Sequence, residues 1–179
     1  MRKRFYFYPF VSRKFPKIVL RGVDMISVLF VCHGNICRSP MAEFVMKDKV
    51  SRAGLADQIH IESAAMHTDE IGNDTHYGTK KLLDRYDIPY EPRAARLTNK
   101  KDYARFDYII GMDSYNLRDM QRLFHNDPDQ KLSLLMDWVG ISRDVADPWN
   151  TGDFETTYED VDAGCTALLE HLKRGLAGR

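Results

Sequence analysis

A thiol and a guanidinium lie six positions apart in residues 31–40, which read VCHGNICRSP. Between Cys32 and Arg38 the chain contains Gly34 and Asn35, residue types that favour a tight loop. The backbone N–H groups of such a loop can surround one tetrahedral anion, and Arg38 can donate two parallel hydrogen bonds to its oxygens. In that positive field Cys32 is expected to be a thiolate at neutral pH. The segment therefore predicts an anion-binding loop around a nucleophile, and phosphoryl transfer through a phosphocysteine.

The residues on either side of this loop predict a strand before it and a helix after it. Residues 26–31 (ISVLFV) are continuously apolar, as in a strand that is buried on both faces of a parallel sheet. Ser39 is a suitable helix N-cap, and Pro40 suits the first helical position. An apolar stripe then continues until Gly54, which is expected to end the helix. The positive end of that helix would face the bound anion.

The remaining sequence alternates between strand-like and helix-like segments. Strands are predicted at residues 59–63, 107–112 and 131–136, helices at 75–86, 98–105, 114–124 and 154–174, and loops at 66–74 and 144–153. This order predicts an α/β fold, namely a four-stranded parallel sheet in a doubly wound, three-layer α/β/α sandwich that forms a single domain. Ligands of such sheets bind at the carboxyl ends of the strands, where Cys32 is placed.

Composition excludes several classes of protein. The chain has 179 residues, 44% of them hydrophobic, and a formal net charge of zero. Residues 1–24 hold seven of the 26 basic residues and one of the 26 acidic residues, which leaves the rest of the chain at −6. An acidic body disfavours nucleic-acid binding. Three cysteines are no disulfide framework, which favours a reducing, cytoplasmic compartment. No apolar run approaches the about 18 residues that cross a bilayer, so no stable membrane insertion is expected.

The first 24 residues differ from the rest in being both basic and aromatic. We expect this N-terminal extension to lie outside the fold and the domain to occupy residues 25–175. Two interpretations remain open for the extension. It could be upstream codons read ahead of a true start at Met25, or an arm that touches a membrane surface or a partner.

The full pattern around the loop resembles the low-molecular-weight protein tyrosine phosphatases. The resemblance runs from about residue 26 to residue 173. It includes residues 31–40, 63–65, 70–73, 106–108, 112–113, 116–119, 147–148 and 153–156. The resemblance implies hydrolysis of phosphotyrosine in protein substrates, by a monomer or weak homodimer that uses no cofactor and no metal.

The resemblance also assigns roles to the residues that the chemistry needs. Cys32 would be the nucleophile, and Arg38 with the loop amides would hold the three equatorial phosphoryl oxygens. Asp147, on an Asp-Pro loop, would protonate the leaving phenolate and then accept a proton from water. Ser39 would donate its hydroxyl to the Cys32 sulfur. Asn35 is expected to adopt strained backbone geometry and to tie the loop together through its side chain.

The expected rim of the cleft departs from many relatives. Trp149 can form one wall against a tyrosyl ring. His33 could be a cleft wall, a cationic contact to the substrate, or merely an exposed loop residue. Asp69 occupies a wall position that is often aromatic, which weakens the expected stacking. A histidine that supports the loop asparagine in some members is replaced by Arg93, which puts that supporting bond in doubt.

The other cysteines have separate interpretations. Cys37 could serve packing only, or could form a reversible disulfide that protects Cys32 from overoxidation, as in this family. Cys165 falls on the apolar face of the last helix and is predicted to be a core residue. The histidines have no metal-ligand spacing.

Three other assignments share part of this pattern. Protein-arginine phosphatases share the scaffold but have threonine where this chain has Ile36, whose apolar side chain favours a tyrosyl ring. Thioredoxin-linked arsenate reductases need a further downstream cysteine pair, which is missing. A redox-regulated phosphopeptide-binding module would not need Cys32, Arg38 and Asp147 together. Asp144 and Asp153, the acidic neighbours of Asp147, are interpreted as solvated loop or cap residues.

Overall fold

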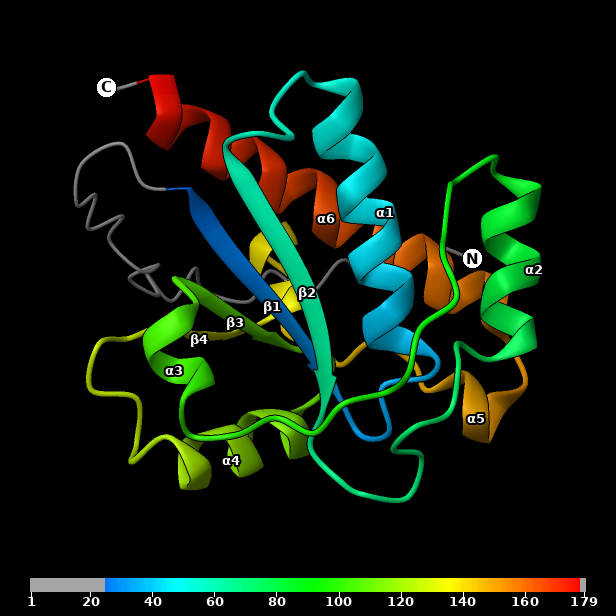
Figure 1. Cartoon of the computed structure of the whole chain (residues 1–179), viewed down its shortest axis with the longest axis horizontal. Coiled ribbons are helices and arrows are strands. Elements are labelled where there is room, and N and C mark those ends of the chain that lie inside the picture. Colours follow the sequence, from blue (N-terminus) through cyan, green and yellow to red (C-terminus); the bar gives the residue numbers. More distant parts are fainter. Residues whose placement is uncertain (1–24, 178–179) are drawn as a thin grey trace, which may run out of the picture.

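A four-stranded parallel sheet forms the centre of the protein in the computed structural model, which describes residues 25–177 (Figure 1). Its strands are β1 (Ile26–Cys32), β2 (Ile59–Ala65), β3 (Tyr108–Gly111) and β4 (Leu132–Leu134), in the spatial order β2-β1-β3-β4. The predicted α/β fold with a doubly wound parallel sheet is confirmed. The N-terminal extension predicted at residues 1–24 lies outside the described residues.

Helices cover both faces of the sheet. One face carries α1 (Arg38–Arg52) and α6 (Phe154–Ala177), with α2 (Tyr77–Arg85) packed against both of them, and the other carries α3 (Asp102–Arg105) and α4 (Ser114–Leu123). Two short helical segments, the 3-10 helix η1 (Leu135–Val139) and α5 (Pro148–Thr151), lie in the connection between β4 and α6. Within residues 25–177, no helix combines the length and apolar character needed to span a bilayer.

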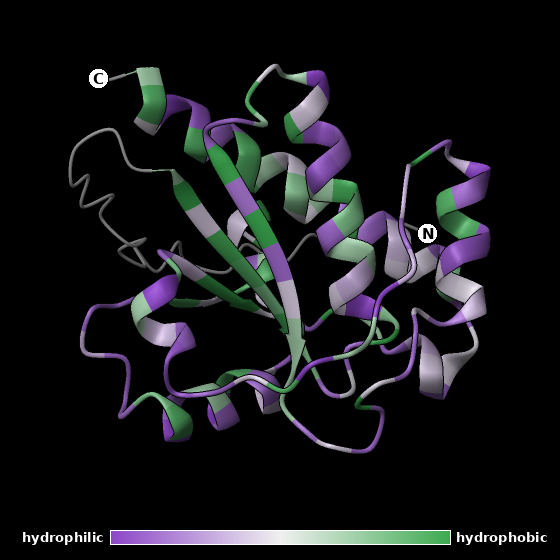
Figure 2. Ribbon diagram, viewed as in Figure 1, coloured by the Kyte–Doolittle hydropathy of each residue, from purple (hydrophilic) through white to green (hydrophobic). Residues whose placement is uncertain are grey.

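The continuous apolar sequence of β1 is explained by burial on both faces. Val28 and Phe30 belong to the large core beneath α1 and α6, whereas Leu29 and Val31 belong to the smaller core beneath α4. Because successive side chains of a strand point to opposite faces, a central strand needs apolar residues at every position. Figure 2 shows this pattern as largely green central strands, while loops and outer helix faces are largely purple. Because β1 is buried on both faces, its position in the sheet is fixed, and Cys32 at its end is fixed with it.

Three helices begin at other residues than the sequence predicted. Cys37, not Ser39, precedes α1, so Ser39 lies inside the first helical turn and its hydroxyl is used elsewhere. The helix predicted from residue 75 begins at Tyr77, because the His76 ring accepts the Gly78 N–H as a cap. The helix predicted at 98–105 begins only at Asp102, since the Thr98 N–H is bonded to the end of β2.

The connection from β4 to α6 contains more helix than the sequence suggested. The strand predicted at residues 131–136 ends at Leu134, and the chain turns into η1 so that Leu135 packs against Gly164 of α6. The loop predicted at 144–153 includes α5, which Pro148 begins and Gly152, with φ +70°, ends. The sequence contained both signals for α5, because proline favours the first helical position and glycine favours the left-handed position after the last helical residue.

Candidate active site

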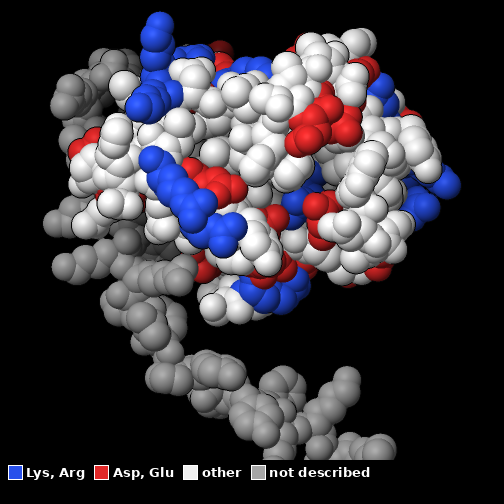
Figure 3. Space-filling view, turned by 90° about the horizontal axis from the view of Figure 1, so that it is seen from below, with Lys and Arg blue, Asp and Glu red and all other residues white. Residues whose placement is uncertain are grey.

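The segment between β1 and α1 forms the floor of a pocket of about 390 Å³ at the carboxyl end of the sheet. Figure 3 shows this end of the molecule, the lower face in Figure 1, with acidic side chains gathered beside a hollow. The residues that line the pocket are Cys32, His33, Gly34, Ile36, Cys37, Arg38, Asp69, Glu70, Asp147, Trp149 and Asn150. Two other predicted site residues, Asn35 and Ser39, are fully buried beside the pocket and do not line it.

The Cys32 sulfur receives hydrogen-bonding groups from its own loop. The Asn35 backbone N–H donates to Cys32 Sγ at 3.3 Å, and Ser39 Oγ lies 3.1 Å from the same sulfur. Asn35 has φ 59°, in the left-handed region, as the resemblance implied. That conformation turns its backbone N–H back toward the sulfur. The loop can therefore stabilise negative charge on Cys32.

The Asn35 side chain ties the loop to its surroundings. Its Nδ2 donates to Ser39 Oγ and to Ser63 Oγ, each at 2.8 Å. Arg93 donates to Asn35 Oδ1 at 2.7 Å and to the Asn35 carbonyl oxygen at 3.0 Å. The doubt about this supporting bond was therefore wrong. An arginine is longer than a histidine and reaches both acceptors at once.

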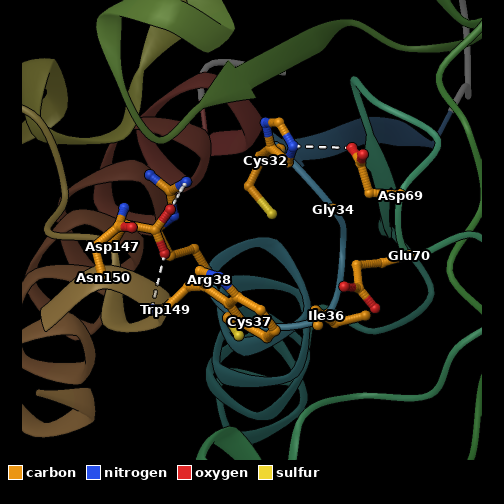
Figure 4. Close-up of a pocket in the computed structure, with 11 residues that line it drawn as sticks. Cys32, Gly34, Ile36, Cys37, Arg38, Asp69, Glu70, Asp147, Trp149 and Asn150 are labelled. Carbon is orange, nitrogen blue, oxygen red and sulfur yellow. Dashed lines mark hydrogen bonds and ion pairs between the residues drawn. The ribbon is translucent and has the colours of Figure 1, made fainter. Parts of the chain in front are cut away.

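Arg38 lies at the bottom of the pocket with 3% of its surface exposed. It donates to Asp147 Oδ2 and to Asp113 Oδ2, each at 2.6 Å, and Figure 4 shows the Asp147 pair beside Cys32. Burial lowers the pKa of Arg38, but the negative charges of Cys32, Asp147 and Asp113 outweigh burial and raise it above its ordinary value. The guanidinium is thus a permanent positive charge next to the sulfur.

Asp113 is the site residue whose contact with Arg38 the sequence reasoning missed. It caps α4, where one of its carboxylate oxygens accepts the Asn116 N–H at 2.7 Å. Its other carboxylate oxygen accepts from Arg38. Its position directly after β3, at the carboxyl end of a strand next to β1, was the signal that could have revealed it.

Asp147 is brought to the loop by the segment after η1. The Val145 N–H bonds to the Met112 carbonyl at 2.8 Å, which fastens this segment to the end of β3. Asp147 Oδ1 accepts the Trp149 N–H at 3.1 Å, so Asp147 also caps α5. As expected, the neighbouring carboxylates act as caps: Asp144 accepts the Ser114 N–H, and the N-terminal turn of α6 is bonded to Asp153.

The rim of the pocket is polar on one side and aromatic on the other. His33 Nε2 lies 3.0 Å from Asp69 Oδ2, and the His33 ring stacks on His67 with 4.2 Å between the ring centroids. Trp149 stands opposite with 64% of its surface exposed. His33 lines the pocket and its side chain is also 55% exposed, so it is both a cleft wall and an exposed loop residue, and a contact with the substrate stays a prediction. Its ring is held by Asp69 and His67.

Two of the lining residues were not singled out from the sequence as site residues. Glu70 packs over the loop so closely that a Cβ added to Gly34 would lie 2.9 Å from its Cγ. A side chain at position 34 would therefore displace the wall of the pocket, which explains glycine there. Asn150, on α5 next to Trp149, also lines the pocket. No charge pattern or spacing in the sequence distinguished it.

The three cysteines are free thiols in distinct surroundings. Cys37 lies on the pocket floor, and burial, reinforced by the negative charges of Cys32 and Asp147, raises its pKa to about 12. Cys165 is fully buried in the core, as predicted, and burial raises the pKa of its thiol. Within residues 25–177, no three His, Cys, Asp or Glu side chains form a group that could hold a metal ion.

Comparison with known proteins places this arrangement in a family. The model of the low molecular weight phosphotyrosine protein phosphatases matches residues 27–177. The low molecular weight protein-tyrosine-phosphatase YfkJ of Bacillus subtilis is 40% identical over 152 residues, which cover 84% of this chain and 97% of that protein. Its crystal structure superimposes with a TM-score of 0.82 at 39% identity, over 85% of this chain and 97% of that one.

Two further solved structures bear on the range of activities found on this fold. SP-PTP, the low molecular weight protein tyrosine phosphatase of Streptococcus pyogenes, has 44% identity and a TM-score of 0.75, covering 83% of this chain and 93% of that one. DARP, a drosophila arginine phosphatase, has 29% identity and a TM-score of 0.75, covering 82% and 97%. From the family match and these relatives, the chain belongs to the low molecular weight protein tyrosine phosphatases, a family of protein phosphatases.

Proposed function

We propose that this protein hydrolyses phosphotyrosine in protein substrates through a phosphocysteine on Cys32. The observation that carries this proposal is that Cys32, Arg38 and Asp147 line one pocket although Asp147 is more than a hundred residues away in the sequence. A thiol nucleophile, a fixed cation and a carboxylic acid are the groups that a phosphate monoester needs for two-step hydrolysis without a metal.

In the first step the Cys32 thiolate forms a bond to phosphorus while the bond from phosphorus to the phenol oxygen breaks. Arg38 and the loop amides hold the three equatorial oxygens. Asp147, as the acid, gives its proton to the departing phenolate. The phosphoryl group would compete with Asp147 for the Arg38 guanidinium, because both carry negative charge. Substrate binding therefore releases the Asp147 carboxyl group toward the leaving oxygen.

In the second step water attacks the phosphocysteine. Asp147, now a carboxylate, takes a proton from the water as the oxygen–phosphorus bond forms. The sulfur–phosphorus bond breaks and the electron pair returns to Cys32, where the Ser39 hydroxyl and the Asn35 N–H stabilise the thiolate. Inorganic phosphate leaves and the enzyme is restored.

The walls of the pocket favour an aryl phosphate. Trp149 offers an exposed ring at the mouth, and the apolar Ile36 lies on the floor. These residues provide apolar surface for a tyrosyl ring, and they offer no group that would place water against a phosphoamide. Phosphoarginine is the alternative substrate, and the similarity to an arginine phosphatase of the same fold gives that alternative a specific basis.

Hydrolysis of phosphotyrosine, phosphoarginine and phosphoserine peptides, measured side by side, tests the proposal. We expect phosphotyrosine to be preferred, Cys32→Ser to abolish turnover, and Asp147→Ala to lower it strongly. Unaltered turnover in Cys32→Ser would exclude the phosphocysteine. Preference for phosphoarginine would overturn the substrate assignment while leaving the mechanism intact.

The finer expectations about setting are also proposals. Three free cysteines support a reducing, cytoplasmic location. Cys37, on the same loop as Cys32, supports reversible redox protection by a disulfide between the two. We also propose that the protein is a monomer or weak homodimer, with the catalytic domain at residues 25–175 and a separate extension before it. Sedimentation of the full chain and of a version that begins at Met25 tests the oligomeric state.

A further inference from the structure

The His76 ring contacts three helices beside the mouth of the pocket. Its Nδ1 accepts the Gly78 N–H at 3.1 Å and thereby caps α2. The ring stacks on Phe154, the first residue of α6, with 5.2 Å between the centroids and 4° between the planes. Trp149 of α5 meets the same ring edge-on, with 6.0 Å between the centroids, and Figure 1 shows α5 beside the N-terminal end of α2. His76 therefore lies where α2, α5 and α6 meet.

The position of the His76 ring is fixed by the structure around it. The His76 backbone N–H donates to the carbonyl oxygen of Ile36, on the pocket floor, at 2.8 Å. The Phe154 ring lies so close to α2 that a Cβ added to Gly78 would be 2.5 Å from Phe154 Cζ. The imidazole is thus held by a backbone hydrogen bond, a helix cap and a stacked ring.

The Trp149 ring has much less support of its own. Its surface is 64% exposed, and α5 contains only four residues. Within residues 25–177, His76 is the only aromatic residue whose ring packs against that of Trp149. An edge-to-face contact between two rings favours one orientation over others. The orientation of Trp149 therefore depends on the His76 ring.

We propose that His76 is a positioning residue that holds Trp149 in place as the aryl wall of the pocket. The inference rests on the proposed function, in which Trp149 contacts the tyrosyl ring of the substrate. A wall that is already oriented loses less side-chain freedom when the substrate binds. Removing the His76 ring should therefore weaken substrate binding and leave the chemical step unchanged.

The helix cap makes this role depend on the protonation state of His76. Nδ1 accepts the Gly78 N–H only in the neutral imidazole that carries its proton on Nε2. A proton added to Nδ1 would face the Gly78 N–H as donor against donor, and the ring would turn away from Trp149. Burial lowers the pKa of His76, so the neutral form predominates at pH 7. Trp149 should lose its support as the pH falls through that lowered pKa.

The charges around His76 leave burial as the main influence on its protonation. Most charged side chains of the adjoining segments form ion pairs with other partners: Asp74 with Lys80, Asp147 with Arg38, and Glu155 with Arg85. Glu70, which lines the pocket, is the carboxylate that acts on the imidazole, and its negative charge raises the pKa of His76 by less than burial lowers it. The Tyr77 ring also packs against His76, with 4.4 Å between the centroids.

Replacement by asparagine separates the ring of His76 from its function as a cap. An asparagine side chain accepts the same backbone N–H at a helix N-cap, so α2 should be retained in His76→Asn. We expect this variant to raise KM for a phosphotyrosine peptide about 3- to 10-fold, with kcat nearly unchanged, because one aromatic contact is lost. In a Trp149→Ala background, His76→Asn should not change KM further. An unchanged KM in His76→Asn, or an equal rise in both backgrounds, would overturn the proposal.

His60→Asn is the matched control. The His60 ring also stacks on a phenylalanine, Phe106, but it lies near the start of β2, at the opposite end of the strand from the pocket. This variant should keep the wild-type KM. Thermal unfolding of each variant shows whether the fold is retained.

Fluorescence tests the contact without turnover. The chain has two tryptophans, and subtracting the emission of Trp149→Phe isolates that of Trp149. We expect the Trp149 emission to change between pH 7 and pH 5 in the wild type and in His60→Asn, and to lose this change in His76→Asn. The same titration in His76→Asn, or no titration in the wild type, would overturn the proposal. If phosphotyrosine is not the substrate, turnover is lost but this titration should remain, so the two failures are distinguishable.

Discussion

Asp147 Oδ2 lies 2.6 Å from Arg38 Nη2, so the proposed proton donor is paired with the residue that is proposed to hold the phosphoryl group. Its other carboxylate oxygen accepts the Trp149 N–H. Both oxygens of Asp147 are therefore engaged. A phosphoryl dianion that takes over the guanidinium would remove this partner and release the Asp147 carboxyl group toward the leaving oxygen. Substrate binding and activation of the acid are thus coupled through one arginine.

Replacing Asp147 by asparagine should lower kcat for a phosphotyrosine peptide by about 10²- to 10⁴-fold, the usual contribution of a positioned general acid. The decrease in kcat should be far smaller for dinitrophenyl phosphate, because its acidic phenol can leave as the phenolate without receiving a proton. Steady-state kinetics on both substrates measure the difference. Asp144→Asn is the control, because Asp144 caps Ser114 outside the pocket. Equal losses on the two substrates would argue against proton donation.

Trp149 should contribute to binding of the aryl group and not to the chemical step. Its ring is 64% exposed, so Trp149→Ala should leave the free energy of unfolding nearly unchanged. Loss of one aromatic contact is expected to raise KM for a phosphotyrosine peptide by about 3- to 10-fold. Inhibition by inorganic phosphate, which has no ring, should not change. Tyr77→Ala is a suitable control, because Tyr77 is even more exposed but does not line the pocket.

The rate at which Cys37 closes a disulfide onto oxidised Cys32 should rise with pH. The Cys37 pKa of about 12 keeps this residue a thiol at neutral pH, and only its thiolate attacks. Since the thiolate fraction below that pKa grows about tenfold per pH unit, disulfide formation should accelerate steeply from pH 7 to pH 9. Thiol trapping after one equivalent of peroxide measures the rate. In Cys37→Ala we expect oxidation of Cys32 to proceed to the sulfinic acid. A rate of disulfide formation that does not change with pH in the wild type would contradict attack by the Cys37 thiolate as the step that sets the rate.

Gly164 should be required by the packing of α6 on η1. A Cβ at this position would lie 2.4 Å from Leu135 Cγ, which is not the free end of a flexible side chain. Gly164→Ala should lower the free energy of unfolding by about 1–3 kcal/mol through overpacking, despite the higher helix propensity of alanine. Denaturant unfolding measures the change, with the exposed Thr166→Ala on the same helix as control. Truncating Leu135 in the alanine background should cost less than in the wild type.

Local sequence was sufficient for the parts of the site that lie close together in the chain. The apolar run of β1, the loop and the apolar stripe of α1 predicted where Cys32 and Arg38 would lie, because strand and helix periodicity are local properties. The boundaries of short elements were less predictable. Residue 135 has the apolar character expected of a strand, but Leu135 lies in η1, packed against α6. That contact belongs to the tertiary structure.

What the sequence by itself determined was the type of chemistry, through the identities of Cys32, Arg38 and Asp147 and the pattern around them. What only the tertiary structure decided was which distant side chains complete the loop. The Asp113 side chain contacts Arg38, and the Arg93 side chain contacts Asn35. The positions of the segments that carry Asp113 and Arg93 depend on strand order in the sheet and on backbone pairing across the fold. The physical reason is that a side-chain hydrogen bond needs its two partners within about 3 Å, whereas sequence patterns place distant elements only by layer and face.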